Sequence, residues 1–256
     1  ATPGDKPTGE LKITADRTQF AEQYEELVLA LEELTPHQKQ KLAECDGHAR
    51  VHMMAAAGAG KTFVAMHLLL RELRAEPDGY CLFVAKSVAL GNFIAGWLAR
   101  RADGREGAAT LLRRLHILAP PMEDGPRVAS VEPRHTTIQL RRCALAASYM
   151  LVVVDEAHSL YARPATCSAF EEYAASASRL LLLSDDSQGL GARVPYPPGL
   201  KTVELTEVVR SSQRIVVGAN AFRCDGVEKA PRCHHNVAGP PLVPILFDGL
   251  RSGPDG

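Results

Sequence analysis

Apolar residues follow two spacings that alternate along most of the chain. Short runs of consecutive apolar residues are separated by longer segments in which apolar residues recur every three or four positions. The runs indicate buried strands, and the longer segments indicate helices that cover them. Strands are expected at Val51–Ala55, Tyr80–Ala85, Leu115–Leu118, Met150–Asp155, Leu180–Ser184 and Thr202–Leu205. Helices are expected at Arg17–Leu34, from Thr35 onward, and at Thr62–Ala75, Val88–Arg101, Thr136–Ser148, Ala165–Ser176 and Ser211–Phe222.

This alternation predicts the class of fold. Strands that alternate with helices of this length are typical of a parallel sheet with helices on both faces, so we expect an α/β, three-layer domain with a mainly parallel sheet. Loops are expected at Ala102–Gly107 and Pro120–Pro133. Residues 1–16 are expected to be disordered and residues 17–224 to form the domain. Residues 225–256, rich in glycine and proline, are expected to form an irregular tail or the start of a truncated second lobe.

Composition narrows the class of protein less than the pattern does. The 256 residues carry 29 Lys and Arg against 30 Asp and Glu, so net charge gives no sign of a nucleic-acid partner. No apolar run approaches the roughly 20 residues that a membrane-spanning helix needs. The six cysteines follow no framework spacing, and the first residues do not resemble a signal peptide. We therefore expect a cytoplasmic or nuclear protein with no membrane partner.

A glycine-rich segment joins the first expected strand to its helix. Residues 55–62 read Ala-Ala-Ala-Gly-Ala-Gly-Lys-Thr. Glycine allows backbone N–H groups to face phosphate oxygens, Lys61 would reach the β- and γ-phosphates, and Thr62 would place its hydroxyl on Mg²⁺. The residues expected to bind the nucleotide phosphates are Gly58, Ala59, Gly60, Lys61 and Thr62. Ala55 stands where the usual phosphate-loop pattern begins with glycine, and an ordinary glycine-rich turn is the alternative.

A second apolar strand ends in two carboxylates. Leu151-Val152-Val153-Val154 is followed by Asp155, Glu156, Ala157 and His158. Ligands bind at the carboxyl ends of strands in open α/β sheets, so Asp155 can hold Mg²⁺ and Glu156 can orient or deprotonate an attacking water. A buried strand running out into a polar turn is the alternative, which the upstream phosphate loop disfavours. His158 either couples the site to a neighbouring element or caps the following turn.

The order of these segments resembles the first RecA-like lobe of a superfamily 1 helicase, and more narrowly the Schlafen-type helicase-like P-loop domain. The resemblance extends over roughly residues 30–245 and implies ATP and Mg²⁺ as cofactors. It implies that Gln38 reads adenine, that Gln188 senses the γ-phosphate and that Arg210 reaches that phosphate. It also implies single-stranded DNA or RNA as a partner, contacted by the strand-to-helix turn Phe83-Val84-Ala85-Lys86-Ser87 through Leu90. The ending His235-Asn236-Val237-Ala238-Gly239-Pro240-Pro241 resembles Schlafen-like chains too.

Each of these short motifs has a plainer interpretation. Gln38 can be a solvated helix residue, Lys86 and Ser87 ordinary loop residues, and Gln188 part of a polar turn. Arg210 can be a surface arginine at the start of a helix. The basic pairs Arg100-Arg101, Arg113-Arg114 and Arg141-Arg142 can be solvated helix faces or phosphate contacts. A zinc site is possible among Cys224, Cys233, His234 and His235, although the spacing of the cysteines matches no tight zinc knuckle.

The sequence leaves two classes of function open. The first is an ATP-hydrolysing lobe of a helicase-like, nucleic-acid-handling protein. The second is an ATP-dependent signalling or regulatory switch that does not unwind nucleic acid. A GTP-binding protein lacks its Asn-Lys-x-Asp segment here, and a small-molecule kinase fits the acidic strand end less well. Too few residues follow the Arg210 motif to form a second RecA-like lobe, so that lobe is expected in a longer chain or in a partner protein.

Overall fold

The structure is a computed structural model, and the described residues are 33–131, 138–144, 146–185, 194–220 and 231–239. The chain divides into two units, Ala1–Glu33 and Leu34–Gly256, and every described residue except Glu33 belongs to the second. The expected disorder of residues 1–16 and most of the expected helix Arg17–Leu34 lie outside the described residues. Glu33 and Leu34, the end of that expected helix, are not helical.

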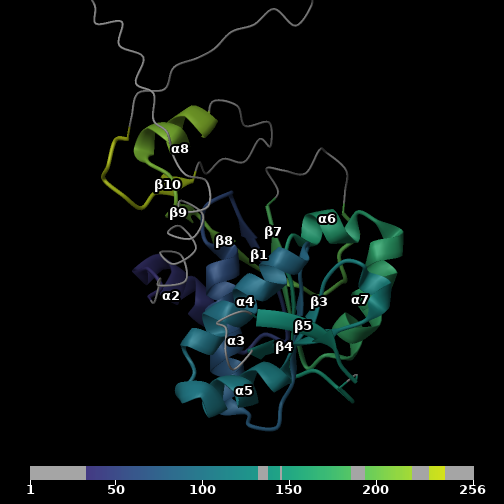
Figure 1. The fold of residues 1–256 in the computed structure, drawn as a ribbon. Coiled ribbons are helices and arrows are strands. Elements are labelled where there is room, and N and C mark those ends of the chain that lie inside the picture. The colour runs from purple at the N-terminus through teal and green to yellow at the C-terminus, as the bar shows by residue number, and fades with distance from the viewer. Residues whose placement is uncertain (1–32, 132–137, 145, 186–193, 221–230, 240–256) are drawn as a thin grey trace, which may run out of the picture. The chain divides into compact units, whose positions relative to one another are not determined.

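A sheet of eight strands forms the middle layer of the domain, with the order β5-β4-β3-β2-β6-β7-β1-β8 (Figure 1). Every pair from β3 through β2, β6, β7 and β1 to β8 is parallel, whereas β4 and β5 are added antiparallel. The strands are β1 (Arg50–Ala55), β2 (Cys81–Val84), β3 (Leu115–Leu118), β4 (Arg127–Val131), β5 (Ile138–Arg142), β6 (Leu151–Val154), β7 (Arg179–Ser184) and β8 (Lys201–Leu205).

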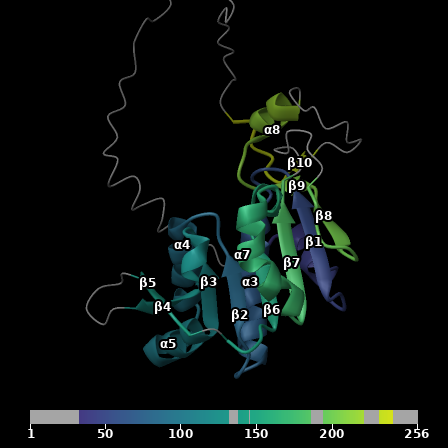
Figure 2. The same cartoon turned by 90° about the vertical axis from the view of Figure 1, so that its right-hand side faces the viewer.

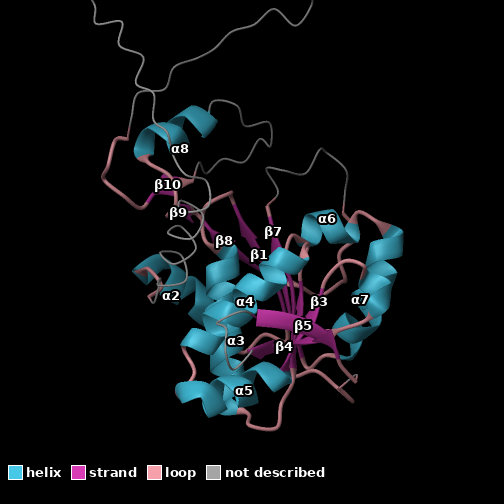
Figure 3. Ribbon diagram, viewed as in Figure 1, coloured by secondary structure: helices cyan, strands magenta, loops and turns pink. Residues whose placement is uncertain are grey.

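Helices cover both faces of the sheet, so the predicted α/β, three-layer fold is confirmed. Figure 3 shows α3, α4 and α5 on one side and α6 and α7 on the other. The helices are α2 (Pro36–Ala43), α3 (Lys61–Ala75), α4 (Val88–Arg100), α5 (Gly104–Arg114), α6 (Ala157–Tyr161), α7 (Pro164–Ser176) and α8 (Gln213–Asn220), with a 3-10 turn at Met122–Asp124. A second, two-stranded sheet pairs β9 (Glu207–Val208) with β10 (Arg232–Cys233).

The central strands are apolar throughout because both of their faces are covered. Every residue of β2, β3 and β6 is buried, as expected for parallel strands between two layers of helices. On one face, Leu82, Val152 and Leu180 belong to a single buried cluster with Phe170 of α7. No helix in the described part of the chain is long and apolar enough to cross a membrane.

The helix expected over Thr136–Ser148 is wrong, because the described residues of this segment include the strand β5 and no helix. Along β5 the half-buried Ile138 and Leu140 alternate with the exposed Gln139 and Arg141, which is the two-residue period of a strand. The strand pairs antiparallel with β4, where Leu140 lies opposite Ala129. That pairing partner falls in a segment expected to be a loop, so nothing in the sequence pattern indicated a hairpin.

Two expected loops contain regular structure. The segment Ala102–Gly107 includes the start of α5, and Pro120–Pro133 includes the 3-10 turn and β4. In α5 the buried residues are Ala108, Leu111 and Leu112, at helical spacing. The glycines at the start of this segment led to the prediction of a loop. The segment is helical because packing of its apolar face stabilises the helix. The tail expected from Asp225 likewise contains a strand, β10.

Candidate functional site

The phosphate loop runs from the carboxyl end of β1 into the first turn of α3. Gly58 and Gly60 have φ values of 80° and 86°, in the left-handed region that residues with a Cβ avoid. A Cβ on Gly60 would also lie 2.5 Å from Gln38 Nε2. The backbone conformation therefore requires glycine at both positions. This requirement is more specific than that of an ordinary glycine-rich turn.

Lys61 is the first residue of α3 and is 8% exposed. Its Nζ donates to the carbonyl oxygen of Ala55, 3.3 Å away, so the ammonium group is held across the loop. The 15-residue helix α3 also directs its unpaired N-terminal N–H groups toward the same place. The loop thus gathers a cation and several backbone donors, which suits a phosphate chain.

Thr62 and Asp155 join the two nucleotide motifs. Thr62 Oγ1 donates to Asp155 Oδ2 at 2.9 Å, although the residues are 93 positions apart. Burial raises the pKa of Asp155, and the hydrogen bond from Thr62 opposes that rise. A hydroxyl and a carboxylate oxygen side by side are ligands that Mg²⁺ accepts. The two side chains therefore fit the metal that the sequence predicts.

Glu156 follows Asp155 with an unusual backbone conformation. Its φ is 51°, the one positive φ of a non-glycine residue in the described part of the chain, and its N–H donates to Asp155 Oδ1 at 2.9 Å. Its Oε2 lies 3.4 Å from His158 Nε2. Backbone outliers of this kind persist where surrounding contacts impose them and cluster at functional sites. The Glu156 side chain is 25% exposed, so its carboxylate remains accessible.

His158 connects the acidic strand end to the end of β7. Its Nδ1 accepts the backbone N–H of Asp185 at 3.2 Å. A ring nitrogen that accepts carries no proton, so in this tautomer Nε2 carries the proton and can donate to Glu156. The sequence left open whether His158 couples the site to a neighbouring element, and this contact supplies the element.

Gln38 lies against the phosphate loop and is 2% exposed. Its Nε2 donates to the carbonyl oxygen of Ala59 at 3.0 Å, and its Oε1 accepts the N–H of Thr35 at 3.0 Å. The second contact completes a capping box at the start of α2, because Thr35 Oγ1 accepts the N–H of Gln38. The interpretation of Gln38 as a solvated helix residue is therefore wrong.

The segment that carries Arg210 also contacts the phosphate loop. The N–H groups of Val209 and Arg210 both donate to the carbonyl oxygen of Gly58, at 3.0 and 3.2 Å. A Cβ on Gly58 would lie 3.3 Å from Arg210 Cβ. The Arg210 side chain is exposed. The backbone therefore places the Cβ of Arg210 beside the phosphate loop, and the exposed side chain is accessible to a ligand.

Two contacts near this segment had no distinctive sequence signal. Glu207 Oε2 accepts from Thr35 Oγ1 at 3.3 Å, and the N–H of Thr206 donates to His37 Nε2 at 3.2 Å. They tie β9 and the residue before it to α2. The sequence indicated these residues only because they stand within the short motifs around Gln38 and Arg210.

Other predicted residues divide into three groups. Lys86 and Ser87 are exposed beyond the carboxyl end of β2, where Ser87 caps α4 by accepting the N–H of Leu90 at 3.2 Å. Gln188 and Cys224 lie outside the described residues. Among the residues that the structure describes, no group of three His, Cys, Asp or Glu side chains could hold a metal, so nothing in that part supports a zinc site.

The basic pairs also have structural partners. Arg114 donates to the carbonyl oxygens of Leu73 and Glu76, both at 2.7 Å, and so holds the C-terminal end of α3. Arg142 pairs with Asp124 at 2.5 Å. These two arginines therefore have partners within the fold.

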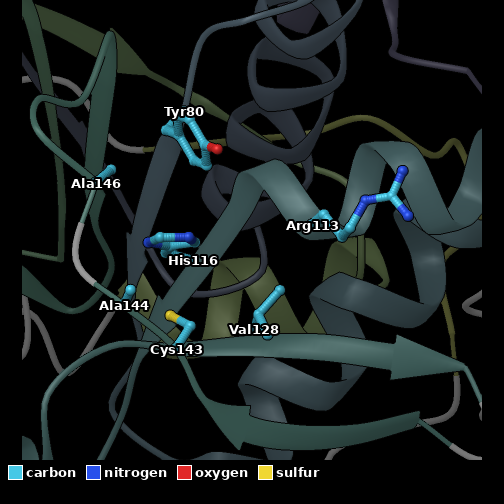
Figure 4. Close-up of a pocket in the computed structure, with 7 residues that line it drawn as sticks. All are labelled: Tyr80, Arg113, His116, Val128, Cys143, Ala144 and Ala146. Carbon is cyan, nitrogen blue, oxygen red and sulfur yellow. The ribbon is translucent and has the colours of Figure 1, made fainter.

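A cavity of about 280 Å³ lies at the opposite, amino-terminal edge of the sheet (Figure 4). Tyr80 precedes β2, and His116 is the second residue of β3, where its Nδ1 lies 2.8 Å from the Tyr149 hydroxyl. Burial lowers the pKa of His116. Parallel strands place their two ends at opposite edges, so this cavity is separate from the phosphate loop.

The comparisons with known proteins find likeness only among solved structures. No protein-family model and no curated protein matches the chain. The Hef helicase domain of Pyrococcus furiosus is 18% identical, with a TM-score of 0.40 and a match covering 66% of this chain and 37% of that one. Unliganded Pif1 from Bacteroides sp is 13% identical (TM-score 0.37; 73% and 45% covered). The Aeropyrum pernix ORC1 protein in complex with DNA is 15% identical (TM-score 0.35; 70% and 48% covered).

The chain spans less than half the length of each of these three structures. The fold class itself follows from the sheet order and from the geometry of the phosphate loop. The domain has a three-layer α/β fold with a mainly parallel sheet, as predicted, and β7 lies between the strands that carry the two candidate nucleotide motifs.

Proposed function

We propose that this domain binds and hydrolyses ATP as one lobe of a helicase-like, nucleic-acid-handling protein. The observation that supports this most is the 2.9 Å hydrogen bond between Thr62 and Asp155. It brings the end of the phosphate loop and the acidic strand end to one edge of the sheet. Paired motifs of this kind serve phosphoryl transfer, in which the protein positions groups and neutralises charge.

Each residue has a distinct task in this proposal. Bound Mg²⁺ supplies charge that polarises the phosphate oxygens, and Thr62 and Asp155 would hold it. Lys61 and the N-terminal end of α3 bind the β- and γ-phosphates. Glu156 orients the water and takes its proton, helped by His158, which fixes the carboxylate. Arg210 neutralises negative charge at the γ-phosphate from the other side of the loop.

The partners belong to the same proposal. Lys86 and Ser87, exposed at the carboxyl edge of the sheet, would contact single-stranded DNA or RNA together with Val88, which is 41% exposed. Gln38 would read adenine with the second N–H of its amide and the second lone pair of its amide oxygen, which its two protein contacts do not use. A second RecA-like lobe, in a longer chain or a partner protein, would complete the nucleotide site. Schlafen-like membership remains a prediction.

Nucleotide binding is tested by Lys61→Ala. Titration with a fluorescent ATP analogue should show a large loss of affinity, because the cation nearest the phosphates is removed. Lys201→Ala, an exposed lysine on β8, is the matched control and should bind as the unsubstituted chain does. Unchanged affinity in Lys61→Ala would contradict the assignment of the phosphate loop.

Chemistry and partner are tested separately. Glu156→Gln should still bind ATP but hydrolyse it about 100-fold more slowly or worse, because an amide cannot take the proton. The control is Glu204→Gln, an exposed carboxylate on β8. Single-stranded DNA or RNA should then stimulate hydrolysis by the unsubstituted chain. A rate of hydrolysis that neither nucleic acid changes would favour the regulatory switch instead.

A further inference from the structure

The residues after α8 return to the segment that carries Arg210. Residues 231–239, here called the β10 segment, contain the two-residue strand β10 (Arg232–Cys233), which pairs with β9 in parallel. The N–H of Arg232 donates to Thr206 O at 2.7 Å and the N–H of His234 to Val208 O at 2.9 Å. Figure 2 shows β9, β10 and α8 beyond the ends of β1, β7 and β8, on the side of the phosphate loop.

One peptide plane is bonded from both sides. The peptide between Val209 and Arg210 donates its N–H to Gly58 O at 3.2 Å, on the phosphate loop. Its carbonyl oxygen, on Val209, accepts from His235 Nε2 at 2.6 Å. The Arg210 side chain leaves the backbone at the end of this plane. Fixing both polar groups of the peptide therefore fixes the point from which the exposed Arg210 side chain extends.

Further contacts of the β10 segment flank that peptide. His234 Nδ1 lies 3.2 Å from Glu207 Oε2, and the Cys233 thiol donates to Ser211 O at 3.2 Å. Glu207 and Ser211 stand three residues before Arg210 and one after it. The segment thus holds the backbone on both sides of the arginine.

The far end of the β10 segment is fixed to α8. The first two N–H groups of that helix, on Gln213 and Arg214, donate to Val237 O and Ala238 O, both at 3.1 Å. Arg214 also donates through its side chain to Gly239 O at 2.8 Å. First-turn N–H groups have no partner within a helix, so these carbonyls satisfy them. The contacts make the β10 segment a fixed support for β9.

We propose that the β10 segment positions Arg210 for reaction at the γ-phosphate, with His235 as the positioning residue. The inference rests on the proposed function, since it assigns a support to one group of that site. His235 touches neither nucleotide nor metal in this scheme and acts only through the Val209–Arg210 peptide. Its contribution is therefore to the placement of the arginine and not to the binding of ATP.

The test is a double-substitution cycle in steady-state ATPase assays on the 256-residue chain. His235→Ala should lower kcat by up to about tenfold and leave KM unchanged, since one hydrogen bond that orients the arginine is lost. In an Arg210→Ala background the same substitution should have no further effect. His235→Gln, which keeps a donor, should restore part of the rate. Asn236→Ala, an exposed neighbour, is the control.

A readout independent of activity accompanies the cycle. Trypsin cleavage after Arg210, followed by mass spectrometry, should be faster in His235→Ala and unchanged in Asn236→Ala. Additive losses in the double variant, or equal cleavage rates, would overturn the inference. A chain that neither binds nor hydrolyses ATP would instead refute the proposed function, and the cleavage rates would still decide whether His235 fixes this backbone.

Discussion

Several side chains of the candidate site bond to one another as well as offering atoms to a nucleotide. Thr62 bonds to Asp155, Gln38 to the phosphate loop, and His158 to both Glu156 and the end of β7. Each such contact fixes a rotamer or a tautomer in advance. Groups that are already oriented cost less to arrange during reaction, which is the basis of electrostatic preorganisation.

His158 gives the sharpest prediction at the residue scale. His158→Ala should lower kcat by about tenfold or more, because Glu156 loses the ring that holds its carboxylate, a contribution of the size of one oriented hydrogen bond. ATP-analogue affinity should stay the same, since the contacts of His158 with Glu156 and Asp185 do not involve the phosphate loop. Stopped-flow binding and ATPase assays measure the two quantities. His48→Ala, an exposed histidine, is the control, and a loss of affinity would refute the positioning role.

Gln38→Ala separates a supporting role from base reading. The substitution removes the contact with Ala59 O, so affinity should fall for ATP and GTP alike, with a larger fall for ATP if adenine is also read. Gln40→Ala, on the exposed face of α2, should change neither affinity. Competition against a fluorescent analogue gives both constants. An unchanged affinity for both nucleotides would exclude both roles.

At the scale of elements, the sequence predicted the parallel strands and the two nucleotide motifs because their signals are local. A fully apolar strand such as Leu151–Val154 needs no knowledge of its neighbours. The strand β5 does need that knowledge, since Ile138 and Leu140 become inward residues only once β4 lies beside them. The strand β10 was missed for the same reason, because its two residues form a strand only against β9.

Site residues show the same division. The glycines, Lys61, Thr62, Asp155 and Glu156 were predicted because adjacent residues define their motifs. The ties of His158 to Asp185 and of His235 to Val209 join residues 27 and 26 positions apart. Spacing along the chain does not encode such contacts, and only the packing of α6 and β10 creates them.

Two helical glycines give opposite predictions for the same substitution. Alanine in a helix is favoured over glycine by about 1 kcal/mol. On α5, a Cβ at Gly107 would meet nothing closer than 3.7 Å, so Gly107→Ala should raise the free energy of unfolding by about 0.5–1 kcal/mol. On α4, a Cβ at Gly91 would lie 2.7 Å from Ile117 Cγ2.

Ile117 is fully buried, so the clash at Gly91 should outweigh the helix preference. Gly91→Ala should therefore destabilise the domain by about 1–3 kcal/mol, the usual cost of overpacking a core. Urea unfolding followed by circular dichroism measures both variants. Equal shifts in the same direction for the two would show that α4 does not press on β3 at this position.

At the scale of the molecule, buried thiols and phenols should make the free energy of unfolding fall as pH rises through the alkaline range. Burial, with the Asp46 carboxylate adding to it, raises the pKa of Cys45 from 9.0 to about 11. A raised pKa means that the fold is stabilised fully below pH 9.0 and loses that contribution as pH rises toward about 11. Burial also raises the pKa of Tyr149 and Tyr161.

Cys45→Ala isolates the thiol. Between pH 9 and 11 the unsubstituted chain should lose roughly 2–3 kcal/mol more of its free energy of unfolding than the variant does, because the Cys45 thiol loses its proton there in the unfolded chain but keeps it in the folded domain. Urea unfolding at several pH values gives both curves. Parallel curves would mean that Cys45 reaches water in the folded domain.

The insertion of β7 between β1 and β6 has a consequence for how the chain folds. Translation delivers the phosphate loop and the acidic strand end first, and the strand that must separate them arrives only at Arg179–Ser184. Until then, β1 has neither of its sheet neighbours, because β8 comes later still. The strand β7, which lies between the strands that lead to Thr62 and to Asp155, is therefore synthesised after both of these residues. Until β7 has left the ribosome, the edge of β6 that pairs with β7 in the finished sheet has no partner strand.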